Sequence, residues 1–405
     1  MSNHKTHQSA LPNQSTQCVW SGETEHALYE GATQQPVVHS VSFAYQNIDD
    51  WHAVALEQAE GHIYTRNTNP TVRAFEDKVR DLEGAAAATS FSSGMAAISN
   101  TLYTFLRPGE RVVSIKDSYG GTNKLFTEFL PAIDIDVRLC DTTDYAGIEA
   151  AVNQGCRLLY LESPTNPTVK IIDIERLAKA AKAVGALVVV DNTFATPINQ
   201  NPLQLGADIV IHSATKYLGG HADALGGIAC GSRDLIKKIY HFREINGAAL
   251  APMDAYSLLR GMKTLSLRID RQNRNALIIA NWLLQQPMVE QVNYPGLPTH
   301  PNHDVARKQM RGFGGMLSFS VAGGLDAIKE FLPRLRYAHM AANLGCVETV
   351  VGPPLVTSHV ECTTEERAAA GIPEGLVRYS TGIEDVEDLL ADLEQALCNT
   401  SRTNR

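Results

Sequence analysis

The stretch ADIVIHSATKYLGGHADALGG, residues 207–227, joins a short apolar run to a lysine that stands between hydroxyl residues and glycines. The run Ile209-Val210-Ile211 is typical of a strand buried on both faces, as in a parallel sheet. Lys216 follows Ser213-Ala214-Thr215 just beyond this run. Because ligands bind beyond the carboxyl ends of the strands in open α/β sheets, Lys216 is the first candidate functional residue.

The same rhythm of apolar runs and helical patterns occurs upstream. Arg111–Ile115, Leu158–Leu161 and Leu187–Val190 are apolar runs that each end in polar or small residues. Between the second and third runs, apolar residues recur with a helical period from Ile174 to Val184, and Gly185 follows as a stop. Strands that alternate with helices predict a mostly parallel α/β sheet.

The sequence changes character after about residue 255. A long helical pattern runs from Met253 to about Gln286, and the chain closes with a predicted strand at Leu376–Ser380 and a predicted acidic helix from Glu384 to Leu397. We interpret this region as a second, smaller α/β domain. The predicted division is an N-terminal arm of residues 1–62, a large domain of residues 63–255 that binds the cofactor, and a small domain of residues 256–405.

Composition excludes several classes of function. The 405 residues carry a formal net charge of -9, which argues against nucleic-acid binding, and no apolar span is long enough to predict a membrane helix. The polar N-terminus lacks the apolar segment of a secretory signal. Seven scattered cysteines without a C-x-x-C pair predict reduced thiols in a cytoplasmic protein, and the histidine spacing predicts no metal site.

Lys216 and Asp191 together indicate a particular cofactor. A lysine amine forms Schiff bases with carbonyl cofactors, although a lysine at a sheet edge can also be merely ion-paired. Asp191 ends the Leu187–Val190 run, so it is expected near the same sheet edge. There it either caps a loop, pairs with an arginine, or holds a pyridine nitrogen in its protonated form. Pyridoxal phosphate requires that carboxylate together with a Schiff-base lysine.

Other residues complete such a site. Gly94 and Met95 stand at a predicted helix start, where backbone N–H groups bind phosphate well, and Ser213 and Thr215 add hydroxyl groups. Capping alone would explain the helix start equally well. No G-x-G-x-x-G follows a strand, so a nicotinamide-binding domain is a poor alternative.

Two further side chains each have a functional and a purely structural interpretation. Tyr119 ends a predicted strand and can stack on a flat ring or pack as an ordinary half-buried tyrosine. Arg378 can clamp a substrate carboxylate or form a salt bridge with a nearby acid.

With these motifs in place, the sequence resembles the cystathionine γ-synthase family, the pyridoxal-phosphate enzymes of cysteine and methionine metabolism. The likeness runs from about residue 20 to residue 395. The motifs that carry it are Tyr64-Thr65-Arg66 with Asn69-Pro70-Thr71, Ser93-Gly94-Met95, Asp117–Thr122, Glu162–Pro167, Asp191-Asn192-Thr193, Ser213–Lys216, and Arg378 with Gly382–Asp385.

The resemblance implies an aspartate-aminotransferase-like fold (fold type I), pyridoxal 5′-phosphate as the cofactor, and a homodimer or homotetramer. It implies catalytic roles for Lys216, Tyr119 and Tyr64, with Tyr64 and Arg66 reaching the site of a neighbouring subunit. The implied cofactor-binding residues are Lys216, Asp191, Ser213, Thr215, Gly94, Met95, Tyr119, Tyr64, Arg66, Asn166 and Thr193. The implied substrate-binding residues are Arg378, Asn343 and Asn166.

The expected activity is γ-elimination or γ-replacement in trans-sulfuration, as in cysteine metabolism and methionine biosynthesis. A cystathionine γ-synthase or γ-lyase is the leading expectation, and an O-acylhomoserine sulfhydrylase or methionine γ-lyase is the alternative. Ala342 departs from the pattern of cystathionine-handling members, Asn343 is similar to the sulfhydrylases, and Gly121 lacks the cysteine typical of methionine γ-lyases. A non-catalytic scaffold with this fold is the alternative from another class.

Overall fold

The computed structural model describes residues 12–23, 31–358, 360, 363–364, 367, 371–398 and 400. Its strands are β1 (Ala87–Phe91), β2 (Arg111–Ile115), β3 (Asp136–Cys140), β4 (Leu158–Glu162), β5 (Leu187–Asp191), β6 (Ile209–Ser213), β7 (Gly227–Gly231), β8 (Val289–Asn293), β9 (Met316–Val321), β10 (His339–Met340), β11 (Val350–Gly352) and β12 (Leu376–Ser380). The helices are α1 (Gln14–Trp20), α2 (Ile48–Ala55), α3 (Pro70–Glu83), α4 (Gly94–Phe105), α5 (Gly120–Lys124), α6 (Tyr145–Asn153), α7 (Ile174–Ala183), α8 (Thr196–Asn199), α9 (Arg233–Asn246), α10 (Pro252–Met262), α11 (Leu265–Leu283), α12 (His303–Gln309), α13 (Gly324–Phe331) and α15 (Val386–Cys398).

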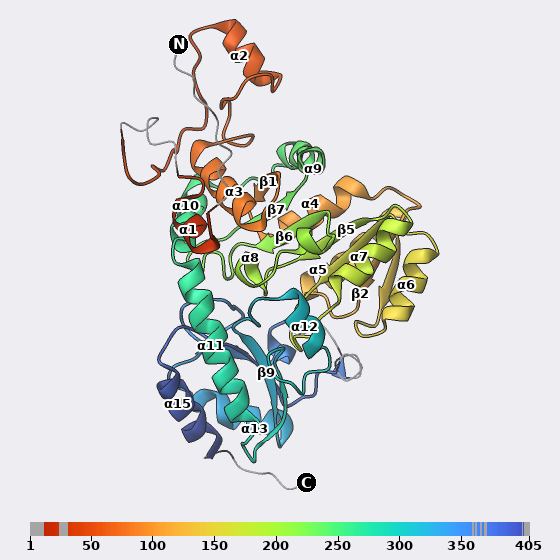
Figure 1. Cartoon of the computed structure of the whole chain (residues 1–405), viewed down its shortest axis with the longest axis vertical. Coiled ribbons are helices and arrows are strands. Elements are labelled where there is room, and N and C mark those ends of the chain that lie inside the picture. Colours follow the sequence, from red (N-terminus) through yellow and green to blue (C-terminus); the bar gives the residue numbers. More distant parts are fainter. Residues whose placement is uncertain are drawn as a thin grey trace.

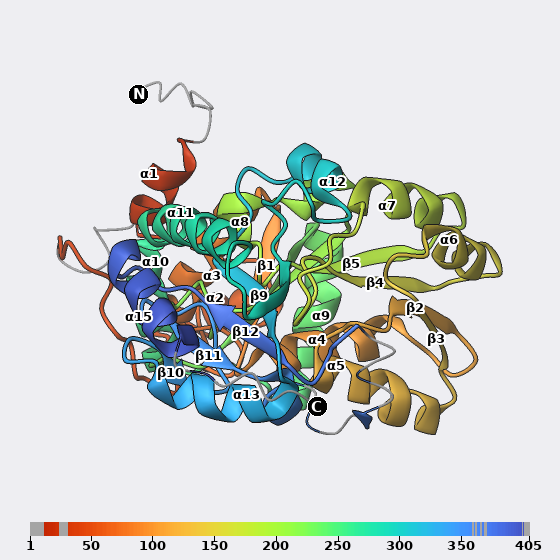
Figure 2. The same ribbon diagram turned by 90° about the horizontal axis from the view of Figure 1, so that it is seen from below.

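A seven-stranded sheet, in the order β1-β7-β6-β5-β4-β2-β3, forms the larger layer. The four apolar runs predicted from the sequence are its strands β2, β4, β5 and β6, and these pair in parallel. Glu162 pairs with Asp191, and Asp191 with Ile211, so the carboxyl ends of β4, β5 and β6 meet at one edge. Helices cover both faces of this sheet (Figures 1 and 2).

The sequence pattern did not mark every strand of this sheet. β7 pairs antiparallel with both β6 and β1, so one edge of the mostly parallel sheet is antiparallel. The sequences GIACG and AATSF are rich in small residues, which have low strand propensity, and this explains why the apolar pattern misses them. Both strands are nonetheless well buried, and β7 supports the strand that precedes Lys216.

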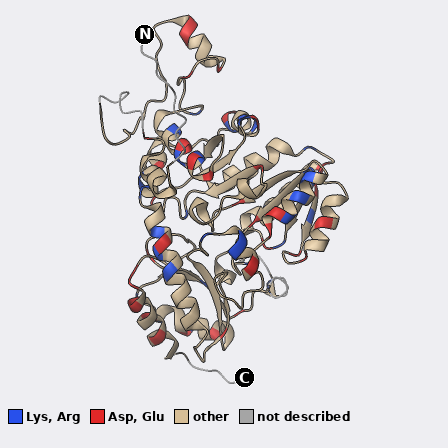
Figure 3. Ribbon diagram, viewed as in Figure 1, with Lys and Arg blue, Asp and Glu red and all other residues tan. Residues whose placement is uncertain are grey.

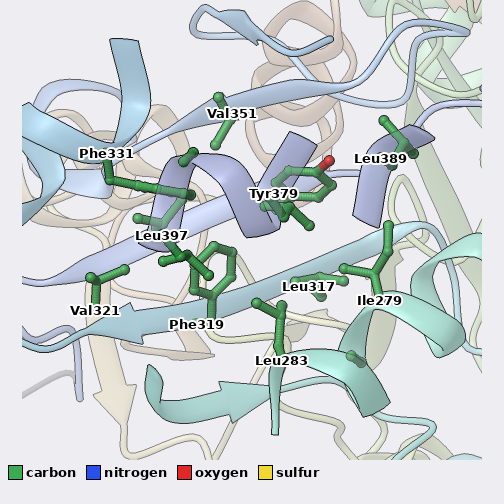
Figure 4. Packing of buried hydrophobic residues seen from close by; sticks show 14 of the residues in the cluster. Ile279, Leu283, Leu317, Phe319, Val321, Phe331, Val351, Tyr379, Leu389 and Leu397 are labelled. Atoms are coloured by element: carbon green, nitrogen blue, oxygen red, sulfur yellow. The ribbon is translucent and has the colours of Figure 1, made fainter. Parts of the chain in front are cut away.

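The second sheet has five strands in the order β10-β11-β12-β9-β8. Its core lies between the central strands and the helices α11, α13 and α15, and Figure 4 shows side chains such as Phe319, Phe331, Tyr379 and Leu389 packed there. The predicted strand Leu376–Ser380 is confirmed as β12. The predicted acidic helix corresponds to α15 and begins slightly later than expected.

The single helix predicted from Met253 to about Gln286 is wrong, because the chain forms α10 and α11 with a break at Lys263-Thr264. The Thr264 hydroxyl and the Arg268 guanidinium donate hydrogen bonds to the carbonyl oxygen of Gly261, at 3.2 and 3.0 Å. At the break, the Gly261 carbonyl oxygen thus accepts hydrogen bonds from side chains, as carbonyl groups at the end of a helix require. The break lets α10 pack on α3 and α11 on the second sheet.

The N-terminal residues lie outside both sheets. α1 packs against α3 and α11, whereas α2 projects away from the rest of the chain (Figure 1). Ile48 and Trp51 of α2 are exposed. Figure 3 shows basic and acidic residues interspersed along the helices. Among the residues that the structure describes, no helix combines the length and the apolar character needed to cross a bilayer.

Candidate active site

A cavity of about 270 Å³ lies beyond the carboxyl ends of β4, β5 and β6, and residues near β11 and β12 close its outer side. Its lining contains most of the site residues expected from the sequence. The lining residues are Ser93, Gly94, Met95, Ile98, Tyr119, Glu162, Asn166, Asp191, Thr193, Phe194, Ser213, Thr215, Lys216, Leu225, Ala342, Leu344, Thr357, Ser358 and Arg378.

Lys216 lines this cavity from the turn after β6. Its Nζ donates a hydrogen bond to Asn343 Oδ1 at 2.8 Å. Burial, and then the charge of Arg378, lower the pKa of Lys216 to about 8. With this pKa, about a tenth of the amine is unprotonated at pH 7, a far larger fraction than for an ordinary lysine, and the unprotonated form is the one that acts as a nucleophile.

The glycines after Lys216 have a steric role. Gly220 adopts a positive φ of 73°, and a Cβ built there would lie 2.1 Å from the guanidinium of Arg268. A glycine is therefore required for the turn to pack against α11. Arg268 in turn donates to the carbonyl oxygens of Tyr217 and Leu218, which anchors the residues that follow Lys216.

Asp191 is buried at the floor of the cavity. Its Oδ1 accepts a hydrogen bond from the backbone N–H of Thr193 at 2.9 Å, and its Oδ2 from the Tyr160 hydroxyl at 3.4 Å. Burial raises the pKa of Asp191, and burial followed by the charge of Asp191 raises that of Glu162 well above its ordinary value. Two neighbouring buried acids thus face a site in which a cationic ring nitrogen would balance charge.

One side of the cavity is suited to a phosphate. Ser93 caps α4 through its hydroxyl oxygen, which accepts from Ala96 N at 3.1 Å. A Cβ on Gly94 would lie 2.6 Å from the Ser213 side chain, and a Cβ on Gly227 would lie 2.1 Å from Ser93 O. The absence of these side chains lets the helix N-terminus lie against Ser213, and backbone N–H groups at such a terminus bind anions.

These features fit the pyridoxal phosphate expected from the sequence. An amine, a buried carboxylate and an anion cradle at a helix N-terminus are the groups that its aldehyde, ring nitrogen and phosphate require. Lys216, Asp191, Gly94 and Ser213 would hold it.

Arg378 also lines the cavity, from β12, and is almost fully buried. One guanidinium nitrogen donates to Asn166 Oδ1 at 3.2 Å and another to the Asn343 carbonyl oxygen at 3.0 Å. None of the described carboxylates lies within ion-pair distance of Arg378, so the salt-bridge alternative has no support. Burial lowers the pKa of Arg378 to about 10, yet the group stays cationic and can bind a carboxylate.

The expected tyrosines and Arg66 lie in two different places. Tyr119 lines the cavity and is 44% exposed, which leaves its ring accessible to a ligand. Tyr64 and Arg66 do not line this cavity. They are exposed on the segment before α3, with the Arg66 guanidinium 5.4 Å from the centre of the Tyr64 ring.

Several lining residues had no role in the sequence analysis. Phe194, Leu225 and Leu344 lie within or next to segments that indicate a site, but no residue pattern marks these apolar side chains themselves. Thr357 and Ser358 also line the cavity, and the next residue, His359, lies outside the described residues. Glu162 was part of a motif, but only the strand register places its carboxylate beside Asp191.

Comparisons with known proteins agree with this geometry. The family model described as Cys/Met metabolism PLP-dependent enzyme matches residues 15–398. The chain is 44% identical to an L-methionine γ-lyase of Fusobacterium nucleatum subsp. polymorphum over 91% of this chain and 94% of that protein. It is 41% identical to a cystathionine γ-lyase of Bacillus subtilis, over 92% and 98% of the two chains.

A solved structure of a cystathionine γ-synthase from Xanthomonas oryzae pv. oryzae, in complex with cystathionine, superposes with a TM-score of 0.91. The two chains are 38% identical, and the match covers 96% of this chain and 98% of the other. The predicted α/β fold of aspartate-aminotransferase type (fold type I), with a large mostly parallel sheet and a smaller second sheet, is confirmed.

Proposed function

This chain belongs to the Cys/Met metabolism PLP-dependent enzymes, and we propose that its own substrate is an L-amino acid with a short, uncharged group on Cγ. Its cofactor is pyridoxal 5′-phosphate, and its chemistry is elimination or replacement at Cγ of sulfur amino acids. Within that chemistry, we favour γ-elimination from methionine or a close analogue.

The composition of the cavity wall carries this proposal. Among the described residues that line it, the carboxylates are Glu162 and Asp191, and both lie buried at the floor. Apart from the amides and Arg378, the described lining on the side of β11 is apolar or carries hydroxyl groups, as at Leu344, Ala342 and Thr357. A distal ammonium group of cystathionine would find no carboxylate there, whereas the methyl group of methionine would bury apolar surface. The relatives named methionine γ-lyase are consistent with this choice.

The proposed mechanism assigns one task to each side chain. Bound pyridoxal phosphate supplies an electron sink for the carbanion that forms at Cα. Lys216 would hold the cofactor by its aldehyde, and its amine, once free, would take the Cα proton. Loss of a Cβ proton would then let the group on Cγ depart. Arg378, positioned by Asn166, binds the substrate carboxylate. Asp191 would hold the ring nitrogen of the cofactor in its protonated form.

Two further roles concern orientation and proton transfer. We propose that Tyr119 stacks on the cofactor ring and assists proton transfer to the departing sulfur. Asn343 accepts a hydrogen bond from Lys216, and we propose that it orients the amine and contributes to substrate binding. Ser213, Thr215, Thr193, Gly94 and Met95 would complete the contacts to the cofactor.

A cystathionine γ-synthase or γ-lyase is the second candidate, and Gly121 favours it. A Cβ at this position would lie 2.9 Å from Met95 Sδ and 3.0 Å from the Tyr119 ring. The space that a cysteine side chain would need is therefore already occupied. The similarity to the solved cystathionine γ-synthase structure, of which 98% is matched by this chain, also supports this candidate.

We propose a homodimer or homotetramer in which Tyr64 and Arg66 complete the site of a neighbouring subunit. Their exposure, and their position away from the cavity of their own chain, support this arrangement.

We also propose the domain division expected from the sequence: an arm of residues 1–62, a large domain of residues 63–255 and a small domain of residues 256–405. The six cysteines among the described residues are all free thiols, which is consistent with a cytoplasmic enzyme.

A substrate panel tests the proposed function. Purified enzyme loaded with pyridoxal phosphate is assayed with L-methionine, L-cystathionine and O-acetyl-L-homoserine, with and without a thiol. Release of 2-oxo acid, ammonia and thiol is measured separately from thioether formation. We expect kcat/KM for methionine elimination to exceed that for cystathionine by about tenfold or more, because none of the described wall residues offers a carboxylate to the distal ammonium group of cystathionine. A preference for cystathionine would establish the second candidate instead.

A further inference from the structure

A buried polar cluster lies behind the cavity, and none of the roles proposed so far uses it. Its centre is Glu83, the last residue of α3, which is fully buried. Its Oε1 lies 2.6 Å from His212 Nε2 and accepts a hydrogen bond from Asn192 Nδ2 at 2.9 Å. Its Oε2 accepts one from Asn201 Nδ2 at 3.3 Å.

The partners of Glu83 are direct neighbours of cofactor-site residues. Asn192 follows Asp191, and His212 precedes Ser213. Because successive side chains along a strand point to opposite sides, Asp191 and Ser213 line the cavity while Asn192 and His212 meet Glu83 behind it. A single carboxylate thus binds the ends of two adjacent strands. In front, the Ser213 backbone N–H donates to Thr193 Oγ1 at 2.9 Å.

The cluster also reaches a third loop of the site. Gln200 Nε2 donates to Asn192 Oδ1 at 2.9 Å and to the Ser163 carbonyl oxygen at 3.1 Å. Ser163 begins the loop after β4 that carries Asn166. Gln309 of α12 donates to Gln200 Oε1 at 3.1 Å. The loops after β4 and β5 and the end of β6 are therefore joined through one hydrogen-bonded network.

We propose that Glu83 is a positioning residue that sets the orientation of Asp191 and Ser213 toward the cofactor. A buried carboxylate is an expensive way to stabilise a fold, because it loses its hydration and gains only if its partners are well oriented. Here, side chains on both strand ends meet one group, so a shift of either end would break a charge-assisted hydrogen bond. Directional bonds fix orientation in a way that apolar packing at this position would not.

The test compares Glu83→Gln with Glu23→Gln. Glu23 is a matched control because it is also a buried carboxylate bound to α3, with its Oε1 2.7 Å from Lys78 Nζ, and because its partners Lys78 and Lys263 do not line the cavity. Both variants are expected to lower Tm. Glu83→Gln should also raise the dissociation constant of pyridoxal phosphate by about tenfold and change the induced circular dichroism of the bound cofactor. Its kcat should fall with KM nearly unchanged.

Equal effects of the two variants on cofactor affinity and dichroism would show that Glu83 is only structural and would overturn the proposal. If Glu83→Gln does not fold, Asn192→Ser decides the question. It removes the Asn192 amide that links Glu83 and Gln200 to the end of β5, and it leaves Glu83 with His212 and Asn201. A wild-type dichroism spectrum in that variant would equally overturn the proposal. The inference rests on the cofactor site, and these binding readouts are independent of which substrate the panel identifies.

Discussion

The floor of the cavity and its rim are built differently. Asp191 and Ser213 stand at the ends of adjacent parallel strands, and Lys216 follows in a turn that packs on α11. The rim includes Ala342 and Thr357, which lie in irregular segments on either side of β11. Strand ends hold their side chains in fixed register, whereas loops accept substitution. We therefore assign the cofactor chemistry to the floor and the choice of substrate to the rim.

Among substitutions in the floor, Lys216→Ala should cause the largest loss of activity. Without the amine there is no nucleophile for the cofactor aldehyde and no base for the Cα proton, so kcat should fall by about a thousandfold or more. Steady-state kinetics measures this loss. Circular dichroism in the far ultraviolet should be unchanged, because a half-buried amine is removed without loss of core packing. A variant with near-normal turnover would exclude Lys216 from the chemistry.

Asp191→Asn should have the next largest effect, with kcat reduced on the order of a hundredfold. The amide can still accept from Thr193 but cannot hold the ring nitrogen in its protonated form. Since burial raises the pKa of Asp191 in the folded protein, its ionised form is destabilised by folding at neutral pH. The cofactor-free variant should therefore melt at the same or a higher temperature than the wild type. A markedly lower Tm would contradict this account of the floor.

These floor residues could be predicted from the sequence because strand ends leave a local pattern. Apolar runs located β5 and β6, and the polar residues just after them are Asp191 and Ser213–Lys216. The parallel arrangement then required that they share an edge. Glu83 could not be found in this way, because its partners are distant in sequence and a glutamate at a helix end ordinarily lies in solvent.

The rim could be predicted only in part. Ala342 and Asn343 were noticed through family resemblance, whereas Phe194 and Leu225 left no pattern at all. Small strands such as β7 and the break between α10 and α11 were also missed, since they depend on tertiary contacts rather than on local apolar periodicity. Function on loops is consequently harder to derive than function at strand ends.

Arg378 links the floor to the rim, because its guanidinium donates to Asn166 on one side and to the Asn343 carbonyl oxygen on the other. We therefore consider Arg378→Lys. A lysine cannot reproduce two parallel hydrogen bonds to a carboxylate. We expect KM for the amino acid to rise by about ten- to a hundredfold, the range for losing hydrogen bonds to a charged group. Cofactor affinity should remain near that of the wild type. A large loss of cofactor affinity with a normal KM would show that Arg378 binds the cofactor and not the substrate carboxylate.

Ala342→Glu tests whether the rim selects the substrate. The new carboxylate would line the cavity where the wild-type wall is uncharged, so it should favour a substrate with a distal ammonium group. The ratio of kcat/KM for cystathionine to that for methionine should rise by about tenfold. Ala342→Gln is the matched control, because it has nearly the same size without the charge. An equal change in both variants would mean that volume, not charge, selects the substrate.

The smallest expected effect concerns the titration of Lys216 in the cofactor-free enzyme. Its pKa of about 8, below the ordinary value for a lysine, means that the folded protein releases this proton at lower pH than the unfolded chain does. The rate of pyridoxal phosphate capture should therefore rise with pH and reach half its maximum near pH 8, measured by stopped-flow absorbance. Arg378→Gln should move that midpoint upward only modestly, because burial is the larger cause and the Arg378 charge the smaller one. If the midpoint instead lies near that of a solvent-exposed lysine in the wild type, the amine is hydrated and the floor is not the dry, fixed surface inferred from the strand ends.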